Sequence, residues 1–565
     1  MKDLLNSLAG KLLLLAVLII VALIWLSRPK APWNEAARLD FYSRDQGSRI
    51  MPLAWMQALK QPNGQPFLAD SLSRYGYLPN SASPTPGLPV GFVANGPADS
   101  RSIGMTCSAC HTREIIVGGT AHRIDGGPAI ADFQSFLADL DKAVGSVLQT
   151  DAAFAEFAKA VLGPAPADPA ALHDAVSLWY LRYHTLIEKA LPTPAWGPSR
   201  LDAVAMIFNR LTGLDIGKPP SYLIADNIKP AVAPTRYPFI WNAPVQDFTQ
   251  WPGFAQNGND LLGLSRNLGE VYGVFADFHP RPDPNSPTLK FDYLGNNSAN
   301  FPGLLALENL VKRIPPPKWP FPIDAALSEQ GKAIFARATA QGGCVECHGK
   351  RQGEFRFTPD QTWATPIQDV GTDSREHDIL KFVVNTGELV GAKIPVLTSP
   401  LQPEDAAFSV LATSVLGSIL QKAGQGLGVT LAAPPGARVA GESAAVSVTT
   451  VLKGAFTPHT ITGYPYESRV LEGVWAVAPY LHNGSVPSLA ELLKPAAERV
   501  KSFKIGPDYD IENVGLAAQQ TKFDYTLQTT DCSDRNSGNS RCGHEYGTKL
   551  SPEEKRALLE YLKEL

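Results

Sequence analysis

The motif C-x-x-C-H occurs twice in this sequence and constrains its fold more than any other feature. The two copies lie in "GMTCSACHTREI" and "GGCVECHGK" and consist of Cys107, Cys110 and His111 and of Cys344, Cys347 and His348. Two thiols at this spacing can attach to one porphyrin, and the adjacent histidine then lies beneath the ring as an iron ligand. The pattern predicts a covalently attached haem c at each copy.

Two other kinds of site also use a C-x-x-C pair. A thioredoxin-like redox pair needs a strand–helix–strand context, which neither copy has. A zinc ribbon needs both cysteine pairs to converge on one metal, and it gives the two adjacent histidines no role. The occurrence of two copies in one chain favours two haems over both alternatives.

Residues 1–30 have the character of an export or membrane-anchoring segment. Lys2 and Lys11 precede the uncharged run "LLLLAVLIIVALIWL", which is short for a full membrane span and long for the core of a signal peptide. No small-x-small cleavage pattern follows, so an uncleaved anchor in the inner membrane is favoured over a removed signal peptide. We therefore expect the chain on the periplasmic side of the cytoplasmic membrane, or free in the periplasm after cleavage.

Two cysteines remain outside the motifs. Cys532 and Cys542 lie in the polar loop "DCSDRNSGNSRCG". In an exported protein such a pair is typical of a local disulfide, and two free thiols are the alternative. A disulfide here fits the oxidising compartment that the N-terminal segment predicts.

Charge and composition exclude one class of partner. The 565 residues carry a formal net charge of −4. Without a basic excess, nucleic acid is not an expected partner. The 48 Pro and 47 Gly residues predict long ordered loops between helices.

The length of the chain is too great for one hydrophobic core. The rigid stretch "PPPKWPFP" at 315–322 is the preferred boundary between two halves. We expect an N-terminal haem domain with an aromatic-rich extension over 31–318 and a C-terminal cytochrome c domain over 319–565. The Ala-, Gly- and Val-rich segment 405–450 is interpreted as an insertion in the second domain.

Helices are predicted where apolar residues recur at three- and four-residue spacing. This pattern covers most of 133–184, and it recurs in a helix capped by Ser328 that leads into the second motif. A last helix is expected after Ser551. The predicted fold is mainly α-helical with long ordered loops, and it has two cytochrome c-like domains preceded by one N-terminal transmembrane or signal helix.

The supply of iron ligands limits what the second haem can use. Methionine, a frequent axial ligand of c-type haems, is absent after Met206. His544 lies in the loop before the last helix, so it is favoured as the second ligand of the haem at His348. His482 is the alternative, and whichever histidine does not bind iron is expected to bond a propionate.

The first haem has His111 as its expected proximal ligand, and its other side is less constrained. Trp241, Trp251 and Phe254 lie in an aromatic tract and are candidates for lining an open distal pocket. Either Arg123 or its neighbouring histidine is expected to pair with a propionate. Further conceivable distal groups are Met51, Met105, His122, His173, His184 and His279.

Several longer phrases resemble a known group of proteins. "GMTCSACHTREI", "WNAPVQDFTQWPG", "SRNLGEVYGVF" and "APYLHNGSVPSL" together are similar to the haem rubber oxygenases and related fatty-acid oxygenases, within the bacterial di-haem cytochrome c peroxidase superfamily. The resemblance implies a reactive haem at His111 with an open or O2-occupied distal side, and a closed redox partner at His348. It also implies that Trp241 lies beside or between the haems. Calcium between the domains, as in the peroxidases, stays open, although no calcium-loop pattern is present.

Three functions follow from this resemblance and from the ligand supply. The first is a periplasm-facing oxygenase that uses O2 on an unsaturated apolar substrate such as a fatty acid or a polyisoprenoid. The second is a peroxidase that reduces H2O2 with electrons from a small cytochrome or a quinol-linked donor. The third is an electron-transfer cytochrome without enzyme activity, in which both irons have two protein ligands.

Overall fold

A computed structural model describes six stretches of the chain, separated by short or longer gaps. These stretches are residues 31–98, 100–163, 168–286, 288–356, 361–425 and 463–565. The hydrophobic segment predicted at 1–30 and the second part of the predicted insertion, 426–450, lie outside the described residues. No helix within the described stretches is both long enough and apolar enough to cross a bilayer.

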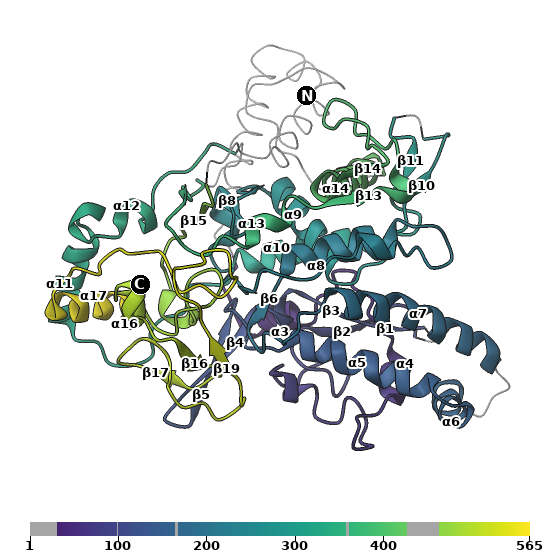
Figure 1. Cartoon of the computed structure of the whole chain (residues 1–565), viewed down its shortest axis with the longest axis horizontal. Coiled ribbons are helices and arrows are strands. Elements are labelled where there is room, and N and C mark those ends of the chain that lie inside the picture. The colour runs from purple at the N-terminus through teal and green to yellow at the C-terminus, as the bar shows by residue number, and fades with distance from the viewer. Residues whose placement is uncertain (1–30, 99, 164–167, 287, 357–360, 426–462) are drawn as a thin grey trace, which may run out of the picture.

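The helices fall into two stacked groups at one side of the molecule and a third group at the other (Figure 1). Their bounds are α3 Glu35–Ser43, α4 Leu53–Ala58, α5 Phe133–Leu148, α6 Asp151–Leu162, α7 Pro169–Ala190, α8 Ala203–Phe208, α9 Asp260–Gly273, α10 Phe301–Val311, α11 Ala325–Phe335, α12 Val345–His348, α13 Glu376–Ile379, α14 Ala407–Gly424, α16 Leu489–Leu492 and α17 Pro552–Glu564.

The strands are short and pair antiparallel in small sheets, most of them with two strands. Their bounds are β1 Met51–Pro52, β2 Phe92–Asn95, β3 Ser102–Met105, β4 Thr112–Val117, β5 Thr120–Asp125, β6 Arg200–Leu201, β7 Thr235–Arg236, β8 Phe248–Thr249, β9 Ala255–Gln256, β10 Arg281–Pro282, β11 Phe291–Asp292, β12 Ile367–Gln368, β13 Val383–Asn385, β14 Glu404–Ala406, β15 Tyr466–Glu467, β16 Ser502–Lys504, β17 Tyr509–Asp510, β18 Gly515–Leu516 and β19 Thr526–Gln528.

The predicted fold class is wrong. Helices make up 37% of the described residues and strands 14%, so the fold is mixed rather than mainly α-helical. The strands escaped the sequence analysis because most have two to four residues, too few to show the alternation that marks a longer strand. They arise in the Pro- and Gly-rich segments that were expected to be plain loops.

Three large hydrophobic cores organise these elements. One lies among α4 to α7, a second among α8, α9 and α14, and the third includes α3, α11, α17 and the loops around β16 to β18. The second core joins residues before 318 to residues after 319, because α14 packs against α8 and α9. The cores therefore cross the boundary that the sequence analysis placed near residue 318.

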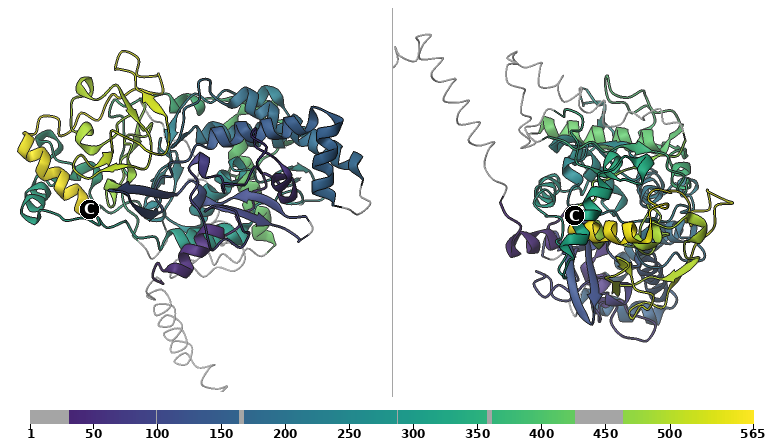
Figure 2. Two further views of the ribbon diagram at one scale, coloured as in Figure 1. Left: turned by 90° about the horizontal axis from the view of Figure 1, so that it is seen from below. Right: turned by 90° about the vertical axis from the view of Figure 1, so that its left-hand side faces the viewer.

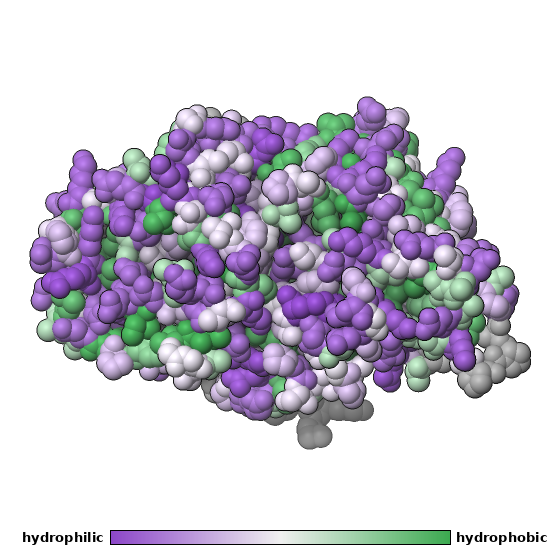
Figure 3. All heavy atoms as spheres, turned by 60° about the horizontal axis from the view of Figure 1, so that its bottom comes forward, coloured by the Kyte–Doolittle hydropathy of each residue, from purple (hydrophilic) through white to green (hydrophobic). Residues whose placement is uncertain are grey.

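The outer surface is mixed in character. On the face drawn in Figure 3, apolar residues lie in small patches among hydrophilic ones. Most large apolar side chains are inside, for example Trp475 and Phe92, each 1% exposed. This distribution is typical of a globular protein that buries most of its large apolar side chains.

The helix predictions for 133–184 are confirmed, with α5, α6 and α7 in the expected places. The last helix begins as predicted, since Ser551 caps α17 and Glu554 completes a capping box. The predicted cap at Ser328 is wrong, because Asp324 caps α11 and Ser328 lies one turn inside the helix. There the Ser328 hydroxyl donates to Glu564 on α17.

Helices α11 and α17 cross at one end of the molecule, opposite the end that carries α6 (Figures 1 and 2). The crossing depends on Gly331, because a Cβ there would lie 1.9 Å from the carbonyl oxygen of Ala557. A larger residue would push the two backbones apart. This crossing places α17 behind the segment that carries the second C-x-x-C-H motif.

Candidate functional site

The first C-x-x-C-H motif forms a turn of 3-10 helix, Cys107–Ala109, between β3 and β4. The hairpin of β4 and β5 follows at once, and Gly118 and Gly119, with φ of 55° and 82°, form its two-residue turn. Ile116 on this hairpin donates its backbone N–H to the carbonyl of Pro507 in the C-terminal part of the chain. The motif is therefore held between both halves.

His111 is held as an iron ligand would be. Its Nδ1–H donates to the carbonyl oxygen of Pro238 at 2.9 Å, so the lone pair is left on Nε2. Burial lowers the pKa of His111 to about 4. The imidazole is thus neutral at ordinary pH, which is the form that binds a metal.

The second motif repeats this arrangement. Cys344 lies at the N-terminal end of the short helix α12, and His348 is the last residue of that helix. The Nδ1–H of His348 donates to the carbonyl oxygen of Arg469 at 2.7 Å, and burial lowers the pKa of the imidazole. Both histidines therefore present Nε2 to a cavity.

The cysteines do not fit a redox pair or a zinc site. Burial raises the pKa of Cys107 and of Cys110 to about 12, and that of Cys344 to about 11, whereas a reactive thiol has a lowered pKa. The two pairs line separate cavities. Among the described residues no three His, Cys, Asp or Glu side chains converge on a metal position.

The second cavity is the space above Cys344, Cys347 and His348, and its volume is about 180 Å³. His544 lies across it, with its ring centre 6.1 Å from the ring centre of His348. Two imidazoles on opposite sides of one metal, each with a bond of about 2 Å, have their ring centres roughly 6 Å apart. His544 and His348 are thus spaced to hold one iron between them.

His482 has a different environment. Its ring also lines the second cavity but stacks on Tyr466, with the ring centres 3.7 Å apart. The structure therefore brings His544, and not His482, opposite His348. Burial is the main cause that lowers the pKa of His544 to about 3, and the neighbouring His348 adds to it.

The first cavity is the space above Cys107, Cys110 and His111, and its volume is about 190 Å³. Among the described residues that line it, His111 is the only histidine. Of the other conceivable distal groups only Met105 contributes to the lining, and it lies two residues from Cys107. The first cavity therefore lacks a counterpart of His544.

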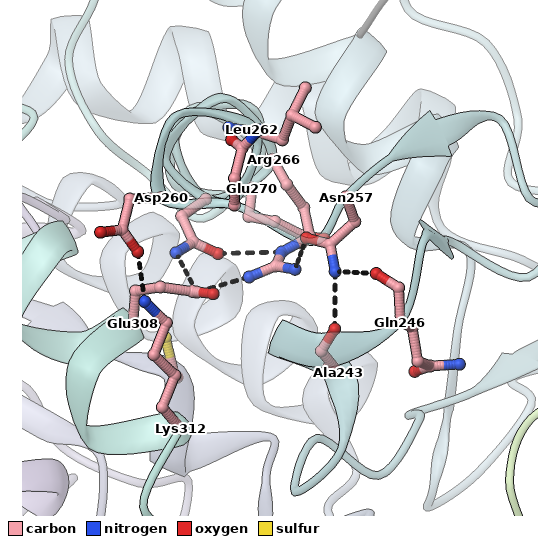
Figure 4. Close-up of polar contacts among 12 residues, drawn as sticks. Ala243, Gln246, Asn257, Asp260, Leu262, Arg266, Glu270, Glu308 and Lys312 are labelled. Carbon is pink, nitrogen blue, oxygen red and sulfur yellow. Dashed lines mark hydrogen bonds and ion pairs between the residues drawn. The ribbon is translucent and has the colours of Figure 1, made fainter. Parts of the chain in front are cut away.

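A polar network from helix α9 occupies one side of the first cavity (Figure 4). Asn259 caps this helix, whose leucines point into the second core, and Arg266 and Glu270 fall one turn apart on the side that faces the cavity. The Arg266 guanidinium donates to Glu308 and to Asn257, each at 2.5 Å. These bonds fix the position of Arg266.

Glu270 is an acidic group of this network with a raised pKa. Burial raises the pKa of its carboxyl, while a hydrogen bond donated by Gln250 at 2.6 Å opposes that shift. The carboxyl faces the cavity and therefore keeps some exposed area. Glu270 can hold a proton beside the first cavity at a pH where an exposed glutamate has lost it.

The two cavities share one wall. Five residues line both of them, namely Arg236, Phe239, Trp251, Glu467 and Arg469. The guanidinium of Arg236 lies 4.7 Å from the Trp251 ring centre, and that of Arg469 lies 4.1 Å from the Phe239 ring centre. Aromatic rings and arginines thus stand between the two motif histidines.

The shared arginines suit the carboxylates of a porphyrin. Arg236 is 7% exposed, and its guanidinium donates to the backbone carbonyls of Leu481 and Tyr237. Burial lowers the pKa of Arg236 to about 9. A buried cation of this kind is stabilised by an anion, and a propionate at either cavity would supply one.

Three predicted residues lie elsewhere. Trp241 lines neither cavity; it packs behind Phe239 with ring centres 4.8 Å apart. Phe254 lines a third cavity next to the first one. Arg123 is on β5, where it donates to the Pro79 carbonyl rather than facing a motif.

The different positions of the three aromatic residues have a common cause. The aromatic tract turns at β8 and β9, so its tryptophans point in different directions, and Trp251 is the one that reaches the wall. The functional residues that the sequence analysis missed are Gln250, Arg266, Glu270 and Glu308 and the wall residues Arg236, Phe239, Glu467 and Arg469. The spacing of Arg266 and Glu270 on an otherwise apolar helix was the available signal.

The last two cysteines do not line either cavity. Cys532 and Cys542 form a disulfide that closes the polar loop in which they lie. The loop is anchored by Asn483, whose side chain donates to the carbonyl oxygens of Gly538 and Ser540. This anchoring fixes the chain directly before His544.

Comparison with known proteins places the chain in a family. A protein of Sinorhizobium fredii (strain NBRC 101917 / NGR234) with the name "Uncharacterized protein y4iJ" is 30% identical, over 94% of this chain and 92% of that protein. The chain belongs to the family of that protein. "Uncharacterized protein y4iM" of the same strain is 24% identical over 65% of this chain and 68% of its own length.

A family described as RoxA-like, cytochrome c-like matches residues 465–504 of the chain. The matched segment contains β15, with Tyr466 and Glu467, and continues through Arg469 and His482, all of which line the second cavity. Over these residues the chain is similar to a RoxA-like cytochrome c, and haem c and a haem-dependent oxidoreductase activity agree with this match.

Proposed function

We propose that this protein is a di-haem oxidoreductase that uses O2 at the first motif to oxygenate an unsaturated apolar substrate, a fatty acid or a polyisoprenoid. The second motif would hold a haem that serves as its redox partner. The observation that supports this proposal is the unequal set of ligands. His544 faces His348 across the second cavity, whereas His111 is the only histidine in the described lining of the first.

The thiols and histidines of each motif fit a covalently held haem. Cys107 and Cys110 would attach the first one and His111 would bind its iron through Nε2, because Nδ1 is already bonded to Pro238. When bound, this group supplies the iron at which dioxygen reacts. The hydrogen bond from Nδ1 sets the orientation and basicity of His111.

Apolar side chains of the first cavity would position the substrate. Val204, Ile207, Val274, Leu307 and Val311 contribute to its lining. They offer no hydrogen bonds to water, so they favour a hydrocarbon over solvent beside His111. The alkene would lie between this apolar side and the polar network of α9.

Glu270 would act as the general acid of the first site, giving a proton to oxygen and taking it back within the same turnover. It faces the cavity, and burial favours its protonated form. Gln250 holds the carboxyl in place through the 2.6 Å hydrogen bond. A positioned acid of this kind contributes about 10²- to 10⁴-fold to a rate.

The shared wall would carry electrons between the sites. Trp251 and Phe239 place aromatic rings between the cavities, and Trp251 is fixed by a 3.0 Å bond from its indole N–H to the carbonyl of Arg236. Incorporation of both oxygen atoms of O2 into the substrate needs no net supply of electrons. The second site would therefore set the starting oxidation state of the first rather than feed each turnover.

The compartment of this reaction is proposed to be the periplasm. Covalent haem attachment and the Cys532–Cys542 disulfide both suit an oxidising compartment. A small cytochrome or a quinol-linked donor would reset the second site after adventitious oxidation. Fractionation of cells followed by haem staining of the chain tests this location.

The proposed reaction is tested by oxygen uptake of the purified holoprotein. A cis-unsaturated fatty acid and a polyisoprenoid should each be tried, with the saturated fatty acid of equal length as a control. We expect uptake with one unsaturated substrate and mass increases of two oxygen atoms from ¹⁸O-labelled O2. Uptake with none of them, or label from water, would refute the proposal.

A peroxidase is the second candidate, and the pair of Gln250 and Glu270 favours it. An amide and a protonated carboxyl side by side can orient H2O2 and donate the proton that its cleavage needs. Turnover of H2O2 with a reduced small cytochrome, without oxygen uptake, would select this function over the oxygenase.

A further inference from the structure

A third cavity adjoins the first one and leads away from it. It shares Val204, Ile207, Gln250, Arg266 and Glu270 with the first cavity and then continues between α9 and α14. At its far end Phe254 and Phe408 are half-buried and meet edge to face, with ring centres 5.7 Å apart. The third cavity therefore runs from the first site towards the protein surface.

The middle of this cavity is apolar. Leu262 on α9 and Leu411 and Val415 on α14 line it, and all three are buried. Its volume is about 40 Å³, against about 190 Å³ for the first cavity. One water-sized group needs roughly 10–15 Å³ in this measure of volume. The third cavity therefore has room for about three methylene-sized groups, and we call this space the row.

The polar groups beside this row are already bonded within the protein. The Ser265 hydroxyl donates to the carbonyl of Leu261, and the Gln256 side chain accepts from Arg356. Gln250 is bonded to Glu270. A polar ligand would have to break these bonds, whereas a hydrocarbon would leave them intact.

Helix α14 belongs to the segment that the sequence analysis could only describe as an insertion. It comes from the C-terminal half but packs on α8 and α9 of the N-terminal half. The contact with α9 is close at Gly269, where a Cβ would lie 3.7 Å from Leu411 and 3.9 Å from Val415. These are ordinary van der Waals distances, so a methyl group fits there and narrows the space.

We propose that the third cavity binds the unbranched hydrocarbon tail of the substrate and that α14 sets the length of chain accepted. The inference rests on the proposed function for the part of the substrate that reacts, and it narrows the substrate class to linear acyl or alkenyl chains. A linear chain fits a cavity of about 40 Å³ better than a methyl-branched polyisoprenoid does, because each branch adds a further group to be accommodated.

Binding of saturated fatty acids to the holoprotein tests this inference without turnover. Dissociation constants from calorimetry should be measured for chains of 8 to 18 carbons. We expect about fourfold tighter binding for each methylene that enters the third cavity, followed by a plateau. Affinity that stops rising before any chain is long enough to leave the first cavity would overturn the proposal.

Gly269→Ala is the variant that narrows the row, and Gly424→Ala is its matched control. Both replace a glycine of a helix by the better helix former, but Gly424 is the exposed last residue of α14 and a Cβ there meets no atom within 4 Å. Gly269→Ala should weaken binding of a 16-carbon chain about tenfold and leave an 8-carbon chain unchanged. Gly424→Ala should change neither.

The outcomes separate this inference from the proposed function when oxygen uptake is measured in parallel. Suppose that affinity rises with chain length, that Gly269→Ala moves the plateau to a shorter chain, and that no oxygen is taken up. This result would support the tail site and refute the oxygenase. Oxygen uptake with a 16-carbon substrate that Gly269→Ala leaves unchanged would support the oxygenase and overturn the tail site. If Gly269→Ala weakened the binding of short and long chains equally, that result would also overturn the tail site.

Discussion

Each of the two cavities is lined by one C-x-x-C-H motif, but the side chains opposite the motif differ. At the second cavity, the ring centres of His544 and His348 lie 6.1 Å apart, and this spacing suits one metal bound by two imidazoles. At the first, the space beside His111 is bounded by apolar residues and by the network of Arg266 and Glu270. The motif and its bonded histidine are nearly identical in both, so they cannot decide what each site does.

What differs is the segment that folds over the motif. The second cavity is bounded opposite His348 by His544, which follows directly after the loop that the Cys532–Cys542 disulfide and Asn483 hold in place. The first is bounded on one side by α9, whose acidic and basic side chains are held by hydrogen bonds within the protein. An iron with a protein ligand on both faces suits storage of an electron. An iron with one free face beside an acidic group suits a reaction with O2 or H2O2.

Removal of the thiols has the largest expected effect and tests whether the sites are independent. The double variant Cys107→Ala/Cys110→Ala should lose about half of the covalent haem and all oxygen uptake, because the reactive site is gone. Cys344→Ala/Cys347→Ala should lose a similar amount of haem but keep ligand binding at the first site. Haem quantitation and mass spectrometry of the intact chain measure both, and equal effects on activity and ligand binding would contradict the assignment.

Glu270→Gln should lower the turnover rate at the first site by about 10²- to 10⁴-fold, because the positioned proton is lost. The native pKa of Glu270 is raised, so its proton is present below that pKa and the rate should fall as pH rises through it. The folded state also binds this proton more tightly than the unfolded chain, so it loses stability over the same rise in pH. The variant should lack this limb of the pH–rate profile, and a profile unchanged by the substitution would show that another group donates.

His544→Ala should make the two sites alike. The reduced protein is expected to bind about one CO per chain before the change and about two after it, since the second site gains an open face. His482→Ala is the matched control, because His482 stacks on Tyr466 instead of facing His348, and it should leave the CO stoichiometry at about one. Optical titration with CO measures this, and the reverse pattern would make His482 the ligand.

The effect of Ser551→Ala should be the smallest, and it should be confined to the second site. It removes the capping box of α17, which packs behind that site through Leu558 and Leu562. The free energy of unfolding should fall by about 1 kcal/mol. Denaturant unfolding measures the loss, and a change in activity at the first site would contradict the separation of the two.

Short-range features were predictable from the sequence. The C-x-x-C-H motifs, the helices over 133–184 and the cap at Ser551 each depend on residues within a few positions of one another. His544 was favoured because the loop before the last helix lies near the haem of a cytochrome c domain. The structure places it there, and its bond to iron stays a prediction.

Long-range features were not predictable in the same way. Trp251 rather than Trp241 reaches the shared wall, and Arg236 and Arg469 rather than Arg123 lie beside the motifs. These choices depend on how β7, β8, β9 and β15 pack against segments far away in the sequence. Local patterns carry no information about that packing, and the same reason hid the two-residue strands.

The central claim is that one site is open and the other is closed by two histidines. Electron paramagnetic resonance of the oxidised holoprotein, with CO titration of the reduced form, measures this directly. We expect one low-spin signal that no exogenous ligand changes and a second signal that does change, with one CO bound per chain. Two irons that both ignore CO, or two that both bind it, would show that the sites do not differ in this way.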